Sequence, residues 1–181
     1  KREDSQGEFV KKYDLKCLES LFLAGERADP DTVLWAQKML SVPVVDHWWQ
    51  TETGSVIVGN PLGIEPLEIK VGSPSVPMPG YHIVVLDETG KDVGREELGA
   101  IAIKLPLPPG TLPTLWDAEK RFHDSYLKTF PGYYETGDAG MIDKDGYVFC
   151  DHPSHFVAHI NTVKELHDVC EYYNKEKLDE V

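Results

Sequence analysis

Apolar positions in the first part of the chain follow the order strand, helix, strand. Residues 18–24 form a largely apolar run that predicts a strand. Pro30 then opens a segment in which apolar residues recur at helical spacing as far as Leu40. Residues 42–45 form a second short apolar run, which is typical of a buried strand. This order predicts a β-α-β unit, so the fold class expected here is α/β.

The pattern changes after position 60, where prolines and glycines separate short strand-like runs. The runs at 81–86 and 99–105 predict strands, with a turn at 87–90. Residues 114–130 indicate an exposed helix. Residues 141–149 indicate a hairpin with Asp-Gly at its turn. Such short strands predict a small β-barrel or a curled sheet.

Hydroxyl and carboxylate side chains follow the apolar run at 42–45, in the segment Asp46-His47-Trp48-Trp49-Gln50-Thr51-Glu52-Thr53-Gly54. We expect the strand to carry Thr51 and Glu52 to a sheet edge, with Gly54 allowing a sharp turn. Ligands of open α/β sheets bind at strand ends. The Glu52 carboxylate could hold Mg²⁺ there, while the Thr51 hydroxyl donates to a phosphate oxygen.

The same segment has plainer interpretations. Glu52 could be a solvated carboxylate, and Trp48 and Trp49 could both belong to the core, as most tryptophans do. Adjacent strand residues point to opposite faces, however. We therefore expect one indole to fill the core and the other to face a cavity.

A second cluster lies at residues 132–140, where Asp138 follows Gly137 and precedes the expected hairpin. Its carboxylate could accept hydrogen bonds from both hydroxyls of a ribose. The alternative is that Asp138 caps the following turn, a common role for Asp near glycine.

Taken together, these motifs resemble the AMP-forming acyl-CoA synthetases of the short-chain, acetyl- and propionyl-CoA type. The resemblance runs from Arg2 to about Cys150. Residues 104–110 are further similar to the propionate-preferring, mitochondrial branch. The segments that carry the resemblance, in the family's order, are Lys11–Leu15, Leu23–Arg27, Trp48–Gly54 and Thr136–Asp138.

The resemblance implies an activity and its cofactors. In this family a carboxylate attacks the α-phosphate of Mg-ATP to form an acyl-adenylate, and the thiol of CoA then displaces AMP. ATP, Mg²⁺ and CoA are therefore the expected cofactors and co-substrates. By the same resemblance Thr51 hydrogen-bonds the α-phosphate, Glu52 coordinates Mg²⁺ and Asp138 binds the ribose.

The resemblance also assigns residues to the adenine and to the acyl group. Gly25, Glu26 and Arg27 correspond to the family's Gly-Glu-Pro turn beside the adenine, with Arg27 in place of proline. The other residues expected on the adenine side are Asp46, His47 and Trp48. Trp49 is expected to close the floor of the acyl pocket, which leaves room for acetate or propionate.

The resemblance places the chain in the C-terminal part of the family's large domain. Residues 1–60 would end the α/β subdomain and residues 61–150 would form a β-rich subdomain. Residues 151–181 stand in place of the hinge and C-terminal domain, with Pro153 where the hinge has arginine. The sequence contains no glycine-rich phosphate loop ending in Lys-Gly. We therefore expect the chain alone to be inactive without these regions. The alternative is a noncatalytic remnant or partner-binding module with weak nucleotide affinity.

Residues 161–170 carry apolar side chains at helical spacing, which predicts a divergent tail with one amphipathic helix. His152, His155 and His159 suggest a zinc site as an alternative. A structural zinc site needs four well-placed ligands, however, so we do not expect one here.

The resemblance implies a small carboxylate and a nucleotide as partners, and charge and composition argue against nucleic acid and membrane. A net charge of −13 argues against nonspecific nucleic-acid binding. No apolar run approaches the roughly 20 residues of a membrane span. The cysteines number three and include no Cys-x-x-Cys pair, which is typical of a reducing compartment. The chain shows no signal or transit segment, so its compartment follows from the resemblance: the mitochondrial matrix, with the cytoplasm as the alternative.

Overall fold

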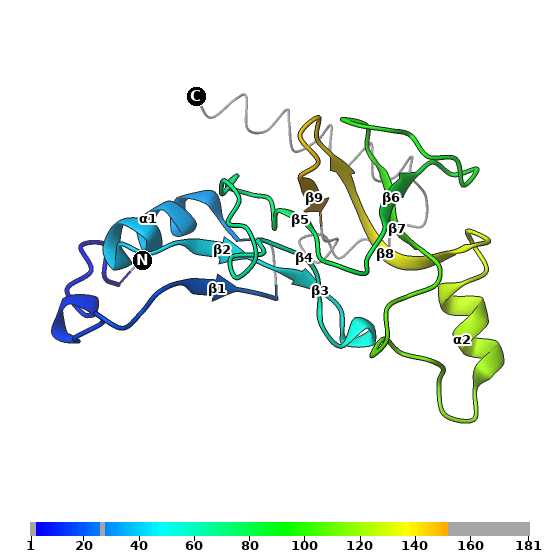
Figure 1. The fold of residues 1–181 in the computed structure, drawn as a ribbon, viewed down its shortest axis with the longest axis horizontal. Coiled ribbons are helices and arrows are strands. Elements are labelled where there is room, and N and C mark those ends of the chain that lie inside the picture. Colours follow the sequence, from blue (N-terminus) through cyan, green and yellow to red (C-terminus); the bar gives the residue numbers. More distant parts are fainter. Residues whose placement is uncertain (1–2, 26–27, 152–181) are drawn as a thin grey trace.

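The computed structural model describes residues 3–25 and 28–151, which form a mixed α/β fold with three small sheets. Figure 1 shows a helix-covered pair of strands at one end of the molecule and a larger antiparallel sheet toward the other. A further short sheet lies between them. The predicted α/β class is thereby confirmed at this level.

The first sheet contains β1 (Leu21–Leu23) and β2 (Val44–Asp46), which pair in parallel. They are joined through α1 (Pro30–Leu40), so the predicted β-α-β unit is confirmed. The helix begins at the expected proline because Asp29 Oδ2 accepts a hydrogen bond from the Thr32 backbone N–H at 2.9 Å. A short 3₁₀ helix, η1 (Val10–Lys12), precedes this unit.

The second sheet is antiparallel and contains β3 (Trp48–Trp49), β4 (Val56–Gly59) and β5 (Val76–Pro77). Between β3 and β4 the chain forms a 3₁₀ turn, η2 (Thr51–Thr53). Thr51 and Glu52 therefore lie on a connecting turn rather than at the end of a continuing strand. Gly54 ends this turn with a φ of +63°, as the glycine predicted.

The third sheet contains the antiparallel strands β6 (Ile83–Leu86), β7 (Gly99–Lys104), β8 (Tyr133–Ile142) and β9 (Val148–Asp151), paired in that order. Figure 1 shows β8 curving along its length, which matches the expected curled sheet. The predicted hairpin joins β8 to β9, with Gly146 at a φ of +94°. Asp138 lies within β8, directly before the paired part of this hairpin, which begins at Ala139. The expectation that Asp138 precedes the hairpin is therefore confirmed.

A bulge in β8 explains the position of Asp138. Pairing with β7 shifts between Ala100 and Ala102, where Thr136–Asp138 lie opposite Ile101 alone. Gly137 adopts a φ of +76° in this bulge, and Thr136 Oγ1 donates to the Ile101 carbonyl at 2.6 Å. A bulge re-aims the side chains of a strand. Alternation along the sequence could not reveal this change of register.

Between β7 and β8 lies α2 (Glu119–Tyr126), which is exposed as expected but shorter than the predicted 114–130. Asp117 adopts a left-handed φ of +49°, which a helix cannot include, so α2 begins only after it. No residue of α2 is buried. The position of the helix therefore depends on a few specific contacts.

The largest core joins the second and third sheets. Trp48, Ile57 and Val58 pack against buried residues of β6 to β9, among them Ile101 and Tyr134. A smaller core lies between α1 and the first sheet. Within the described residues, no helix has the length and apolar character needed to cross a bilayer.

Candidate functional site

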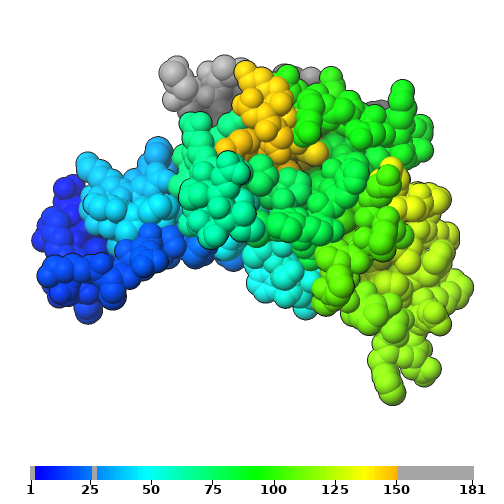
Figure 2. Space-filling model, viewed as in Figure 1, coloured from blue at the N-terminus to red at the C-terminus, as the bar shows by residue number. Residues whose placement is uncertain are grey.

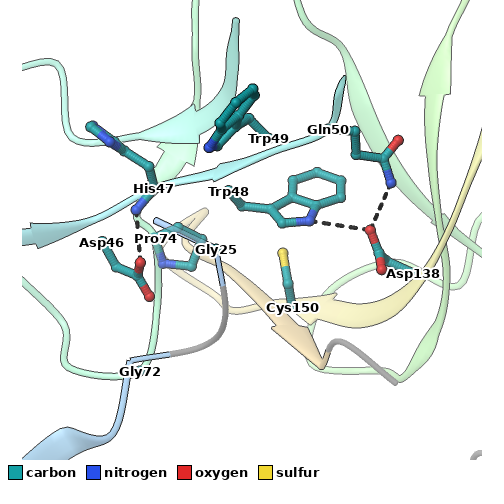
Figure 3. Close-up of a pocket in the computed structure, with 10 residues that line it drawn as sticks. All are labelled: Gly25, Asp46, His47, Trp48, Trp49, Gln50, Gly72, Pro74, Asp138 and Cys150. Atoms are coloured by element: carbon teal, nitrogen blue, oxygen red, sulfur yellow. Dashed lines mark hydrogen bonds between the residues drawn. The ribbon is translucent and has the colours of Figure 1, made fainter. Parts of the chain in front are cut away.

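Residues from separate parts of the chain line an open hollow of about 70 Å³ beside β3 (Figure 3). A volume of this size holds a few water molecules, so these residues form one wall of a site for any larger ligand. Thr51 and Glu52 are not among the lining residues, and Glu26 and Arg27 lie outside the described residues. The residues that line the hollow are Gly25, Asp46, His47, Trp48, Trp49, Gln50, Gly72, Pro74, Asp138 and Cys150.

The two sequence motifs meet at the carboxylate of Asp138. Its Oδ2 accepts hydrogen bonds from Trp48 Nε1 at 3.2 Å and from Gln50 Nε2 at 2.8 Å (Figure 3). Asp138 is only 5% exposed, so these donors stabilise a carboxylate that water reaches poorly. Its partners lie 88 and 90 positions away. Local turn capping does not account for contacts at this separation.

Gln50 is a site residue that the motif analysis quoted but did not assign. Its Nε2 also donates to the Thr136 carbonyl at 2.6 Å, and its Oε1 accepts from Tyr134 Oη at 3.1 Å. Gln50 lies two positions after Trp48, on the same side of an extended chain. That spacing was a usable signal. Gly72, Pro74 and Cys150 carried no comparable signal.

The two tryptophans point to opposite sides of β3 (Figure 3). Trp48 is buried and belongs to the main core, whereas Trp49 is 47% exposed. The prediction from strand alternation is therefore confirmed. Trp49 lines the hollow and is half exposed, so a ligand in the hollow could reach its indole.

His47 and Asp46 form another part of the wall. The His47 ring stacks on Phe22 at 4.7 Å, and Asp46 accepts hydrogen bonds from the backbone N–H groups of His47 and Ala28. Burial lowers the pKa of His47 and outweighs the opposing effect of Asp46. The ring is therefore neutral at pH 7, which favours stacking against an uncharged aromatic group.

Thr51 and Glu52 lie on η2, away from the hollow's lining. Thr51 is exposed, and Glu52 is partly buried. Glu52 Oε1 accepts a hydrogen bond from Tyr126 Oη at 3.0 Å, and its carbonyl accepts one from the Leu112 backbone N–H at 2.7 Å. Burial, followed by the neighbouring Glu52 carboxylate, raises the pKa of Tyr126. The phenol therefore stays protonated and can donate to Glu52.

The described residues contain no cluster of three or more His, Cys, Asp or Glu side chains suited to a metal ion. A single carboxylate still fits Mg²⁺, because this ion commonly takes one or two carboxylates together with water and substrate phosphates. Glu52 is compatible with that mode. The three histidines considered for zinc lie outside the described residues.

The wall formed by Gly72 and Pro74 is fixed to the β8–β9 hairpin through Lys70. Lys70 Nζ lies 2.6 Å from Asp143 Oδ2 and 2.6 Å from Asp145 Oδ2. It also lies 4.2 Å from the centre of the Tyr147 ring. This group of four side chains, which we call the Lys70 clamp, ties a wall of the hollow to the hairpin that directly follows Asp138.

Comparison with known proteins gives one family match. A family model described as "AMP-binding enzyme" matches residues 2–110. An uncharacterised protein of Pseudomonas aeruginosa is 48% identical over 149 residues, covering 82% of this chain and 24% of its own length.

Two named relatives are similar over nearly the same region. The bovine "Acyl-CoA synthetase short-chain family member 3, mitochondrial" is 41% identical over 82% of this chain and 22% of its own length. The Escherichia coli "Propionate--CoA ligase" is 42% identical over 77% of this chain and 23% of its own length. The chain thus spans less than a quarter of the length of each of these relatives.

Proposed function

The chain belongs to the family of AMP-binding enzymes, and from this membership we infer that it carries part of the adenylate site of a short-chain acyl-CoA ligase. In the proposed reaction, a carboxylate oxygen of propionate or acetate attacks the α-phosphate of ATP and releases pyrophosphate. The thiol of CoA then attacks the acyl carbonyl and releases AMP. Such catalysis depends mainly on positioning and on neutralising charge.

One observation carries this proposal: the buried Asp138 carboxylate held by donors from the first motif. A carboxylate fixed in this way is suited to accept hydrogen bonds from two neighbouring hydroxyls. A ribose presents such a pair. We therefore propose that Asp138 binds the ribose, and that Gln50 and Trp48 keep its carboxylate in the required orientation.

The adenine would lie along the same wall. Gly25, Asp46, His47 and Trp48 line the hollow, and the neutral His47 ring offers an aromatic surface. We propose these residues, together with Glu26 and Arg27, for the adenine side of the site.

The phosphates would lie toward η2. We propose that the Thr51 hydroxyl donates to the α-phosphate and that Glu52 holds Mg²⁺. When bound, this ion would neutralise phosphate charge. Glu52 itself would supply one hard oxygen ligand to the ion. The hydrogen bond from Tyr126 Oη to Glu52 Oε1 holds this carboxylate in place.

We propose Trp49 as the floor of the acyl pocket. Its half-exposed indole lines the hollow, where it would limit the length of the acyl chain. The name of the Escherichia coli relative specifies propionate. A short carboxylate, propionate before acetate, is therefore the proposed substrate.

The organisation of the whole protein is also a proposal. Residues 1–60 would end an α/β subdomain and residues 61–150 would form a β-rich subdomain, as in the C-terminal part of a large adenylate-forming domain. Regions that bind the β- and γ-phosphates and receive CoA would be required for activity.

We propose the mitochondrial matrix as the compartment, because the bovine relative is named as mitochondrial. The bacterial relatives make the cytoplasm the alternative.

The test is calorimetric titration of the chain with propyl-AMP, a stable mimic of propionyl-adenylate, in Mg²⁺ buffer. Asp138→Ala should weaken binding by about 2–3 kcal/mol, the scale of charge-assisted hydrogen bonds. Asp87→Ala is the matched control, because the Asp87 carboxylate accepts backbone N–H groups of its own turn, from Thr89 and Lys91. Asp87→Ala should lower the stability of the chain without lowering its affinity for propyl-AMP.

Failure of the folded wild-type chain to bind propyl-AMP would contradict the proposed site. The chain would then be a noncatalytic remnant or a partner-binding module. Equal affinity of the wild-type chain and Asp138→Ala would remove Asp138 from the ribose site while leaving the family unchanged.

A further inference from the structure

Two tyrosines form hydrogen bonds with the residues on either side of Thr51. The rings of Tyr126 and Tyr134 are stacked, with centroids 5.4 Å apart and planes inclined by 8°. Tyr126 Oη donates to Glu52 at 3.0 Å, and Tyr134 Oη donates to Gln50 at 3.1 Å. The two hydroxyls therefore fix the side chains on either side of Thr51.

From this arrangement we propose that Tyr126 is a positioning residue, which orients the Glu52 carboxylate toward a phosphate-bound Mg²⁺. The proposal rests on the function proposed above and deepens it. It assigns to α2 a task that its sequence does not reveal.

Glu52 needs such support. It lies on a three-residue 3₁₀ turn, and a glutamate side chain has several rotatable bonds whose freedom must be restricted before it can hold a metal in one geometry. Tyr126 supplies a rigid ring with a single donor. Tyr134 behind it is only 1% exposed, so the main core fixes the plane against which Tyr126 stacks.

The backbone reinforces this contact. The Leu112 N–H donates to the Glu52 carbonyl at 2.7 Å. A Cβ placed on Gly54 would lie 2.9 Å from the Gly110 carbonyl oxygen, so the two segments touch closely. Figure 2 shows the cyan surface around η2 adjoining the green surface of this connection. The part of the β7–β8 connection around Gly110 and Leu112 therefore lies against the turn.

Tyr126 is the part of α2 best placed to act on the site. The helix buries none of its residues completely, and Tyr126 is the residue of α2 that packs against the main core. This last residue of the helix contacts both Glu52 and Tyr134. Outer contacts of this kind to a metal-binding carboxylate commonly change metal affinity by about 10–100-fold when removed.

The test compares Tyr126→Phe with wild type by calorimetry. The variant keeps the ring and removes only the hydroxyl. Binding of ATP is measured as Mg²⁺ is raised, and binding of propyl-AMP is measured without Mg²⁺. We expect the Mg²⁺ concentration for half-maximal ATP binding to rise about tenfold, with propyl-AMP affinity unchanged within about twofold. Tyr133→Phe, which changes the tyrosine directly before Tyr134, is the matched control. It should match wild type in both binding measurements.

The two proposals fail differently. Wild type that binds propyl-AMP, with Tyr126→Phe unchanged in its Mg²⁺ dependence, would overturn the role of Tyr126 alone. An equal loss of affinity for both ligands would show a general structural role of Tyr126, and it would also overturn the positioning role. Wild type that binds neither ligand would overturn both proposals.

A double variant, Tyr126→Phe with Glu52→Gln, distinguishes the positioning role of Tyr126 from a folding defect. If Tyr126 acts through Glu52, then Tyr126→Phe should add nothing to the Mg²⁺ defect of Glu52→Gln. Independent, additive defects in the double variant would overturn the proposal, whatever the stability of the single variants.

Discussion

The indole Nε1 of Trp48 donates a hydrogen bond to Oδ2 of Asp138 at 3.2 Å, across a sequence separation of 90 positions. Trp48 is at the same time a member of the main core. One side chain therefore serves both the stability of the fold and the orientation of the proposed ribose ligand. Changes at either residue should affect both properties.

Trp48→Phe should lower the free energy of unfolding by about 1–3 kcal/mol, because it removes one donor from a buried carboxylate. It should also weaken propyl-AMP binding, since Asp138 loses part of its orientation. Denaturant unfolding and calorimetry measure the two effects. Trp116→Phe is the control: Trp116 is 98% exposed, so its replacement should change stability by less than about 0.5 kcal/mol. Unaltered stability of Trp48→Phe would contradict the structural role of the indole.

Gly140→Ala should disrupt the pairing of β8 with β9. A Cβ at this position would lie 2.0 Å from the Phe149 carbonyl oxygen and 2.8 Å from Ile101 Cδ1. The backbone must move to relieve this contact, at a cost of about 3 kcal/mol or more. Denaturant unfolding measures the loss.

Gly63→Ala provides the comparison for that experiment. A Cβ at Gly63 meets nothing within 4 Å. Its stability should therefore stay within about 0.5 kcal/mol of wild type. Similar losses of stability in Gly140→Ala and Gly63→Ala would contradict the close contact between Gly140 and β9.

The Lys70 clamp should give stability a defined pH window. Burial opposes ionisation of Asp143, but hydrogen bonds from Lys70 and the Tyr147 backbone outweigh it and hold the pKa of Asp143 below its ordinary 3.8. Hydrogen bonds to Asp143 and Asp145 raise the pKa of Lys70 above its ordinary 10.5. The clamp's contribution is therefore present between these two ordinary values. It is lost as pH falls below 3.8 and as pH rises above 10.5.

Lys70→Met should accordingly lie furthest below wild type in stability near neutral pH, and the two should converge in strong acid and base. Denaturant unfolding across pH measures this difference. Lys120→Met is the control, because Lys120 pairs with Asp124 on the exposed face of α2 and such pairs contribute little. A pH-independent difference for Lys70→Met would mean that packing, not charge, provides the stabilisation.

Trp49→Gly should open the proposed acyl pocket. The variant should bind adenylate mimics with longer alkyl chains, such as hexyl-AMP, more tightly than wild type does, because the indole no longer limits chain length. A series of alkyl-AMP titrations measures the preference, with Trp116→Gly as the control. The same chain-length profile in wild type and Trp49→Gly would remove Trp49 from the acyl site.

Features encoded by neighbouring residues were predictable from the sequence. The start of α1 depends on Asp29 and Pro30, and the turn of the last hairpin depends on Gly146. Strand alternation correctly separated Trp48 from Trp49. In each case the deciding interaction lies within a few positions along the chain.

Features that depend on distant contacts were not predictable from local patterns. The bulge at Gly137 shifts the pairing of β8 with β7 beside Asp138. The contact of Tyr126 with Glu52 joins residues 74 positions apart. Asp117 shortens α2 through a left-handed backbone that its residue type permits but does not require.

The distance between Trp48 and Asp138 along the chain also sets an order of events during synthesis. A ribosome adding about 5–20 residues per second needs on the order of ten seconds to proceed from one to the other. Throughout that interval the nascent chain presents the Trp48 indole and its apolar neighbours without β8 to cover them. Because Val148 and Cys150 of β9 also belong to this core, we expect its apolar residues to stay uncovered until the β8–β9 hairpin has been synthesised as well.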